Sequence, residues 1–248
     1  MLFVDHIFMI LLLVVQPLYG VFEARRHDAL EIAGRPLNRI RYFRETMLVE
    51  WAFLAALLAA WMMLNRPLAG LGFSTSIGPG FWVGIVIVAL LTGHLVYAWR
   101  WATRASQAEK DEQAKLLGKM VRYLPHTRRE LRSFFGVSVT AGIVEEIVYR
   151  GFMFWYLAHV MPLWLAVGVS SVVFGLAHSY QGMNGVLRVT LIGLGFGALY
   201  VGTGSIWLPI VAHILIDALQ GTALHEILRA DDDDPEFQSN QPTSQPTN

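Results

Sequence analysis

The sequence contains no cysteine among its 248 residues, and this absence excludes several classes of protein. Disulfide frameworks, thiolate metal sites and cysteine nucleophiles all need the missing side chain. Prenyl and palmitoyl anchors are attached to cysteine as well, so the chain cannot carry either of them itself. Any chemistry and any membrane attachment must therefore come from other residues.

Charged residues are scarce, at 15% of the chain, and their net charge is zero. Apolar residues make up 54%, above the roughly 45–50% of a soluble domain, and the mean hydropathy is +0.45. The excess lies in long runs, which is typical of a membrane protein in a lipid bilayer. Basic residues flank these runs and form no separate patch, so we expect no nucleic-acid partner.

Seven apolar runs approach the length of about 20 residues that a helix needs to cross a bilayer. Backbone polar groups find no water in lipid, so each run should be a helix. The fifth and sixth runs are the least apolar. The predicted fold class is an all-α, polytopic membrane helix bundle of about seven transmembrane helices. The runs are 4–22, 46–64, 81–99, 133–157, 163–179, 185–202 and 206–226.

The first run could be mistaken for a signal peptide. A signal peptide has Lys or Arg before its apolar stretch. Here Asp5 and His6 occupy that place, and Arg25 and Arg26 follow the stretch instead. We therefore expect a retained first helix.

Lys and Arg are distributed unevenly among the connections. Residues 23–45 contain six, residues 65–80 contain one and residues 100–132 contain nine. Basic connections usually remain in the cytoplasm. The first and third connections are therefore predicted to be cytoplasmic, with the N-terminus outside and the C-terminus inside. A bacterial inner membrane is the expected location.

Composition divides the chain into three parts. Residues 1–122 hold the first three runs and the basic connections, and residues 123–228 hold the last four runs. Thr127 and Glu130 have the spacing of a capping box, which predicts a helix start there. Residues 229–248 form an acidic and polar tail that cannot bury a core, so we expect it to be disordered.

The fourth run carries three ionisable side chains inside the predicted membrane. Each costs roughly 3 kcal/mol or more there, which makes it a functional candidate. Glu146 and Arg150 are four residues apart on one helix face, so they can neutralise one another. Glu145 is rotated by about 100° from Glu146 and is left free for chemistry. The pair itself could equally be a structural tie between helices.

Two later runs each add a histidine with a partner four residues away: Phe174 with His178, and His213 with Asp217. At about 1.5 Å per residue from the intervening turns, these side chains fall in layers that match the fourth run. Antiparallel packing could gather them around one cavity between the midplane and the cytoplasmic side. Small residues would let the sixth helix approach its neighbours closely: Gly193, Gly195 and Gly197.

A carboxylate and a histidine can together activate water for attack on an amide. Glu145 would act as general base, and His178 would share that role or protonate the leaving amine. His213, with Asp217 behind it, could donate to the oxyanion. Glu145, His178 and His213 could instead ligate zinc with one open position, although the sequence has no H-E-x-x-H.

Together these motifs resemble those of the CAAX protease and bacteriocin-processing (CPBP) family of intramembrane glutamic endopeptidases. That family includes the type II CAAX prenyl endopeptidase. Its motifs EExxxR, FxxxH and HxxxN/D correspond to residues 145–150, 174–178 and 213–217. The resemblance covers about residues 122–226. It implies that residues 123–228 form a catalytic helix bundle that works without a cofactor.

The resemblance also implies a role for each site residue. Glu145 would activate water with His178, and His213 with Asp217 would form the oxyanion side. The supporting residues would be Glu146, Arg150 and Phe174. CAAX-cleaving members typically carry Asn where this chain has Asp217, and an ionised Asp would repel an oxyanion. Asp217 must therefore be protonated, orient His213 or serve another purpose.

The expected function is hydrolysis of a peptide bond in a membrane-associated protein or peptide. Two alternatives remain open at this point: a zinc-dependent intramembrane metalloprotease, and a non-catalytic scaffold or immunity-type protein that keeps the polar core for partner binding. A transporter is disfavoured because the sequence shows no inverted repeat.

Overall fold

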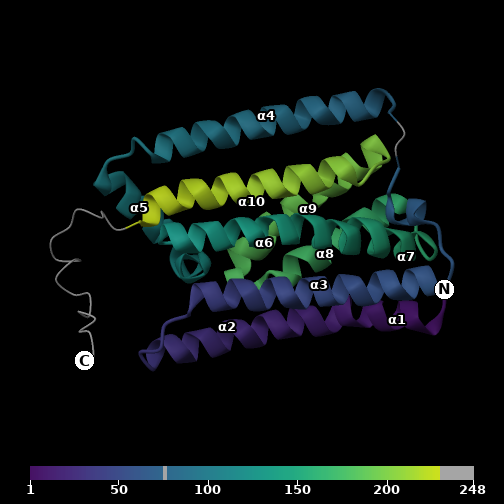
Figure 1. The fold of residues 1–248 in the computed structure, drawn as a ribbon, viewed down its shortest axis with the longest axis horizontal. Helices are drawn as coiled ribbons and strands as arrows, with labels where there is room; N and C mark the ends of the chain where they lie inside the picture. The colour runs from purple at the N-terminus through teal and green to yellow at the C-terminus, as the bar shows by residue number, and fades with distance from the viewer. Residues whose placement is uncertain (75–76, 230–248) are drawn as a thin grey trace, which may run out of the picture.

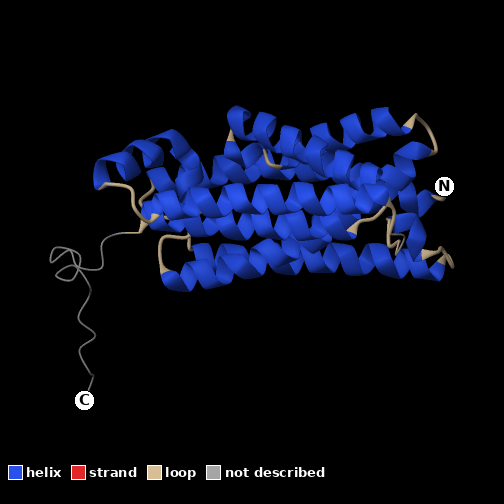
Figure 2. Ribbon diagram, turned by 90° about the horizontal axis from the view of Figure 1, so that it is seen from above, coloured by secondary structure: helices blue, strands red, loops and turns tan. Residues whose placement is uncertain are grey.

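The computed structural model describes residues 1–74 and 77–229, and these form helices and turns without any strand (Figure 2). The predicted all-α class is confirmed. All but one residue of the predicted acidic tail, 229–248, lies outside the described residues.

The described helices combine into seven rods that run along one common axis (Figure 1). Each rod overlaps one predicted run, but the first rod continues to Ile32 and the second begins at Arg39, beyond the predicted bounds. The first and the fourth rods each contain a short π-helical segment between two α-helices. The rods are α1 (Phe3–Ile10), Leu11–Val15 and α2 (Gln16–Ile32); α3 (Arg39–Met63); α4 (Pro79–Ala102); α6 (Arg128–Glu146), Ile147–Met153 and α7 (Phe154–Ala158); α8 (Leu163–Ala177); α9 (Met183–Thr203); and α10 (Trp207–Leu228).

Five of these rods are long and apolar enough to cross a membrane: α1 to α2, α3, α4, α9 and α10. The protein is thus an integral membrane protein. The fourth rod does not meet this criterion of length and apolar character, and its predicted span carries Glu145, Glu146 and Arg150. Helix α8 does not meet it because it is only 15 residues long. The number of crossings and their orientation stay predictions.

The start of the fourth rod follows from local sequence. Thr127 Oγ1 accepts a hydrogen bond from the Glu130 backbone N–H at 3.2 Å, and Glu130 Oε2 accepts one from the Thr127 N–H at 3.0 Å. This reciprocal capping satisfies two backbone donors that a helix start otherwise leaves unpaired. The predicted capping box is confirmed, and it fixes where α6 begins.

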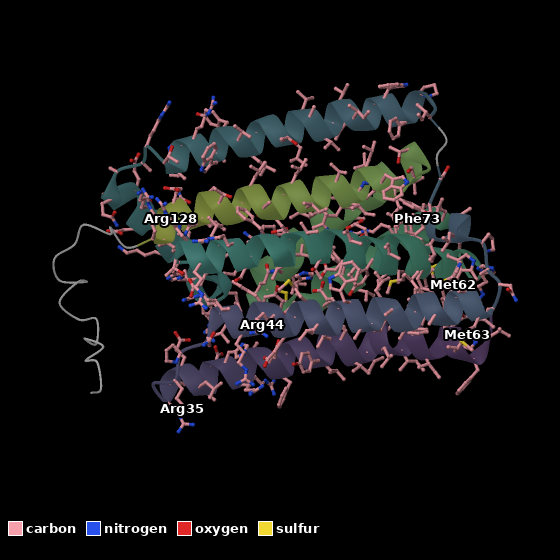
Figure 3. All side chains as sticks on the ribbon, in the orientation of Figure 1. Arg35, Arg44, Met62, Met63, Phe73 and Arg128 are labelled. Carbon is pink, nitrogen blue, oxygen red and sulfur yellow. The ribbon has the colours of Figure 1, made fainter. Side chains whose placement is uncertain are left out.

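The two ends of the bundle differ in chemistry (Figure 3). Arg35, Arg44 and Arg128 lie at one end, and Met62, Met63 and Phe73 lie at the other. The helix α5 (Gln107–Leu117) lies at the arginine end (Figure 1). We call this the basic end; under the predicted orientation it faces the cytoplasm.

Close contact between α8 and α9 depends on glycine. A Cβ added at Gly193 would lie 3.2 Å from the Phe174 ring, and one at Gly197 would lie 2.8 Å from Val167. Nothing lies within 4 Å of the same position at Gly195. The expected close packing is therefore found at Gly193 and Gly197. Gly195 does not contribute to it, because it faces away from the helices next to α9.

Candidate active site

Glu145 lies in the last turn of α6, and its side chain is 12% exposed. Its Oε1 is 4.0 Å from His178 Nε2, and its Oε2 is 3.8 Å from His213 Nε2. Both separations exceed a direct hydrogen bond. Oε2 is buried and has no hydrogen-bond partner within residues 1–74 and 77–229. The structure thus brings together the three residues that the sequence predicted.

His178 ends α8, and its ring is held by its own helix. Nδ1 lies 2.8 Å from the backbone carbonyl of Phe174. A carbonyl oxygen can only accept, so Nδ1 must carry the proton of this hydrogen bond. In the neutral ring the lone pair is then on Nε2, the atom that faces Glu145. The Phe174 ring also packs edge-on against the imidazole at 4.8 Å. Phe174 thus orients His178 both through its backbone carbonyl and through its ring.

Glu146 joins two other site residues. It is fully buried, and its Oε1 accepts hydrogen bonds from Arg150 Nη1 at 2.7 Å and from His213 Nδ1 at 2.8 Å. The predicted ion pair of Glu146 and Arg150 is confirmed. The bond to His213 was not predicted, because sequence spacing cannot show which carboxylate of one helix reaches a ring on another.

The His213 ring therefore has a different arrangement from the expected one. Glu146, and not Asp217, stands behind the ring at Nδ1. Asp217 Oδ2 lies 3.6 Å from Nε2, on the same side of the ring as Glu145. Asp217 is one helical turn after His213, so its carboxylate reaches along α10 to the nitrogen that faces the site. Its chemical role stays a prediction.

Arg150 is buried to 1% exposure under aromatic rings. Its guanidinium carbon lies 4.4 Å from the centre of the Phe174 ring and 5.2 Å from that of Phe196. Its Nη2 donates to the Gly193 carbonyl at 3.3 Å. The arginine is thus stabilised by a carboxylate, a carbonyl and two π faces.

Two features of the site lay beyond sequence reasoning. Phe196 stacks on the His213 ring at 4.9 Å, but in the sequence it is one apolar residue among many. The π-helical segment Ile147–Met153 starts directly after Glu146 and contains Arg150. Segments of this kind are frequent at functional sites, yet the residues that compose this one follow an ordinary helical pattern.

A cavity of about 190 Å³ connects Glu145 to the basic end. Phe134 and Glu145 both line it, and they are eleven positions apart, which corresponds to roughly 16 Å along α6. Tyr123 and the exposed Arg188 line its far end. Its polar lining near Glu145 consists of His178, His213, Asp217 and Glu50.

Glu50 is a further residue of the site, and none of the sequence motifs includes it. The apolar run begins near residue 46, which puts Glu50 near a helix end, from where its carboxylate could reach water. Helix α3 begins at Arg39 instead, so Glu50 lies in mid-helix and faces the cavity. Its Oε2 is buried, with no hydrogen-bond partner in the described part of the chain. The polar residues before an apolar run concealed the helix start.

The described ranges, 1–74 and 77–229, contain no group of three His, Asp or Glu side chains arranged to hold a metal ion. The donors of the zinc alternative are neighbours, with Glu145 oxygens 4.0 Å from His178 Nε2 and 3.8 Å from His213 Nε2. The zinc alternative thus gains no support from this arrangement.

Comparison with known proteins finds similarity in the second half of the chain. Residues 127–219 match the family described as type II CAAX prenyl endopeptidase Rce1-like. This segment is therefore similar to that family. The Rce1-like segment contains all seven predicted site residues, whereas Glu50 lies before it.

One curated relative comes from Bacillus subtilis (strain 168) and is named "Putative membrane peptidase YdiL". It is 35% identical to this chain over 80 residues, which are 32% of this chain and 32% of the relative. The chain is thus matched to about a third of the relative's length. No solved structure matches the chain at a significant level.

Proposed function

We propose that this protein is an endopeptidase of the bacterial inner membrane that hydrolyses a peptide bond of a membrane-associated protein or peptide. Glu145 and His178 activate the water, and no metal takes part. One observation carries the proposal: a buried carboxylate with a free oxygen faces the Nε2 atoms of two histidines at the inner end of a cavity.

The geometry around Glu145 suits the positioning of a water molecule. Glu145 Oε1 and His178 Nε2 are both acceptors and lie 4.0 Å apart. A water placed between them could donate one hydrogen to each at ordinary hydrogen-bond length. Its oxygen attacks the substrate carbonyl carbon while Glu145 takes a proton. The C–N bond then breaks, and the proton passes to the leaving nitrogen from Glu145 or His178.

His213 forms the oxyanion side of the proposed mechanism. With both ring nitrogens protonated, it would donate Nδ1–H to Glu146 and Nε2–H to the oxygen that becomes negative. Glu146 is itself held by Arg150, so the ring has a fixed orientation before substrate arrives. Asp217, beside Nε2, is assigned to orient that nitrogen between turnovers.

The cavity suggests how a substrate enters. It reaches the basic end, which is the cytoplasmic side under the proposed orientation. The lining extends over roughly 16 Å of α6, so a substrate segment has to be extended to reach Glu145 through this narrow cavity. The proposed substrate therefore presents an extended segment from the cytoplasmic face of the membrane.

The function is tested by quantitative proteomics of new peptide termini in membranes of cells that carry wild type, Glu145→Gln or Glu45→Gln. Glu45 is an exposed residue of α3 paired with Arg41, so it serves as the control. We expect membrane-protein fragments that appear with wild type and Glu45→Gln but not with Glu145→Gln. Identical profiles for all three would favour the scaffold alternative. Activity of the purified protein that is lost to chelators and restored by zinc would favour the metalloprotease.

The orientation is tested with single cysteines, because the chain has none of its own. Arg35→Cys marks the basic end and Met63→Cys marks the opposite end. In intact cells, we expect an impermeant maleimide to label Met63→Cys and to label Arg35→Cys only after lysis. The reverse pattern would invert the proposed topology.

A further inference from the structure

Glu50 has a buried carboxyl oxygen, Oε2, that the proposed mechanism does not use. It comes from α3, outside the Rce1-like segment, and it lines the same cavity as Glu145, His213 and Asp217. Burying a carboxyl group is costly unless it is hydrogen-bonded. Its Oε2 nevertheless has no partner among the residues that the structure describes. Such an exception calls for an explanation.

The placement of Glu50 is fixed by packing between α3 and α6. Trp51 Nε1 donates to Thr140 Oγ1 at 3.0 Å, and Met47 Sδ would lie 3.1 Å from a Cβ at Gly136. These two contacts flank Glu50 in the sequence and set the register of the two helices. This packing therefore sets the face of α3 on which Glu50 lies.

The face of α3 that carries Glu50 forms one wall of the cavity along its length. Its cavity-lining residues recur at helical spacing: Tyr42, Phe43, Thr46 and Glu50. A second, adjoining wall comes from α6 in the same manner: Phe134, Val137, Ala141 and Glu145. A chain that runs along these walls toward Glu145 therefore also meets Glu50.

The inner end of the cavity has many hydrogen-bond acceptors and few donors. Glu50 Oε2 and Glu145 Oε2 are free acceptors among the described residues, and His178 Nε2 carries a lone pair. The Arg150 guanidinium is turned to Glu146 and to the Gly193 carbonyl. A peptide backbone brings the missing donors, because each residue other than proline carries an N–H.

We propose that Glu50 is a further substrate-contacting residue, whose free carboxyl oxygen accepts a hydrogen bond from a backbone N–H of the substrate next to the cleaved bond. This inference rests on the proposed peptidase function and extends it to the N-terminal half of the chain. Glu50 then holds the extended substrate in place while Glu145 acts on the water.

The experiment uses the full-length protein in lipid nanodiscs and a peptide library made by digesting a bacterial membrane proteome. The library peptide that wild type cleaves fastest is resynthesised, and kcat and KM are measured for wild type, Glu50→Leu, Glu50→Gln and Glu45→Leu. Gln keeps an acceptor oxygen at this position, whereas Leu removes it. Glu45→Leu is the control on the exposed face of the same helix.

We expect Glu50→Leu to raise KM roughly tenfold with little change in kcat, in line with the loss of one hydrogen bond. Glu50→Gln should stay within about threefold of wild type, and Glu45→Leu should match wild type. In a Glu145→Gln background, adding Glu50→Leu should weaken binding of the same peptide by the same factor. Thermal unfolding of each variant checks that the fold is intact.

Two results would overturn the inference while leaving the peptidase function in place. Unchanged KM in Glu50→Leu would show that the carboxyl group does not contact substrate. An equal collapse of kcat in Glu50→Leu and Glu50→Gln would show that Glu50 carries a proton instead. A wild type that cleaves no library peptide faster than Glu145→Gln does would reject the peptidase function and this inference with it.

Discussion

The two halves of the molecule are both helical and both apolar, but they differ in how many polar residues they bury. Among the described residues, Asp5 and His27 are the polar residues of the first half, residues 1–126, that are buried as a whole, whereas Glu50 buries one carboxyl oxygen. The second half buries nine: Ser138, Thr140, Glu146, Arg150, Ser170, Ser171, Ser205, His213 and His225. Burying polar groups is costly. Their concentration in the second half agrees with the candidate site lying there.

The comparison with known proteins divides the chain at the same place, since the Rce1-like segment begins at residue 127. The first half nevertheless contributes one wall of the cavity through α3. The second half thus supplies the proposed chemistry, and the first half helps to shape the space in which it takes place. The following variants test that division.

The largest expected difference lies between two histidines. His178→Ala should lower kcat by about 10²- to 10⁴-fold, the usual contribution of a general acid or base. His94→Ala, on the exposed surface of α4 in the first half, should leave kcat unchanged. Rates for the fastest-cleaved peptide measure both. A similar loss in the two variants would remove the functional distinction between the halves.

Ion pairs give the next difference, in stability. Glu146→Ala leaves Arg150, which is 1% exposed, without its carboxylate, and should cost about 3–5 kcal/mol. Asp5→Ala breaks the pair with Arg66 in the first half, where Arg66 is 16% exposed and also stacks on Trp155. The loss of folding stability in Asp5→Ala should be clearly smaller than in Glu146→Ala. The free energy of unfolding of both variants in detergent tests this ranking. A larger loss for Asp5→Ala than for Glu146→Ala would contradict it.

Helix packing gives a smaller difference. A Cβ at Gly175 would lie 2.7 Å from the Val186 carbonyl and would collide with Thr190, so Gly175→Ala should cost about 1–3 kcal/mol. Gly93 in α4 and Gly168 in α8 have nothing within 4 Å of that position. Alanine there should leave the unfolding temperature unchanged or raise it. Equal effects at all three would mean that α8 and α9 do not pack as described.

Much of the fold could be predicted because the membrane restricts the choices. An apolar run in lipid must be helical, and all seven runs are found in helical rods. The start of α6 followed from Thr127 and Glu130. The start of α3 did not, because its first residues are polar and resemble a connection. That error hid Glu50, since only the true helix start shows that its side chain lies deep in the bundle.

The site was predictable to the extent that it depends on spacing along one helix. The pair of Glu146 and Arg150 is four residues apart and was found that way. The bond between Glu146 and His213 joins residues 67 positions apart, and only packing can reveal it. The position of Asp217 relative to the His213 ring depends on the same bond, which is why the sequence placed it behind the ring.

The central claim is that Glu145 and His178 act on one water molecule. A double-mutant cycle of Glu145→Gln and His178→Ala, read in kcat for the fastest-cleaved peptide, tests it most directly. Residues that act as a unit are non-additive, so the double variant should be no slower than the worse single variant. Losses that multiply in the double variant would show that the two residues act independently and would contradict the account.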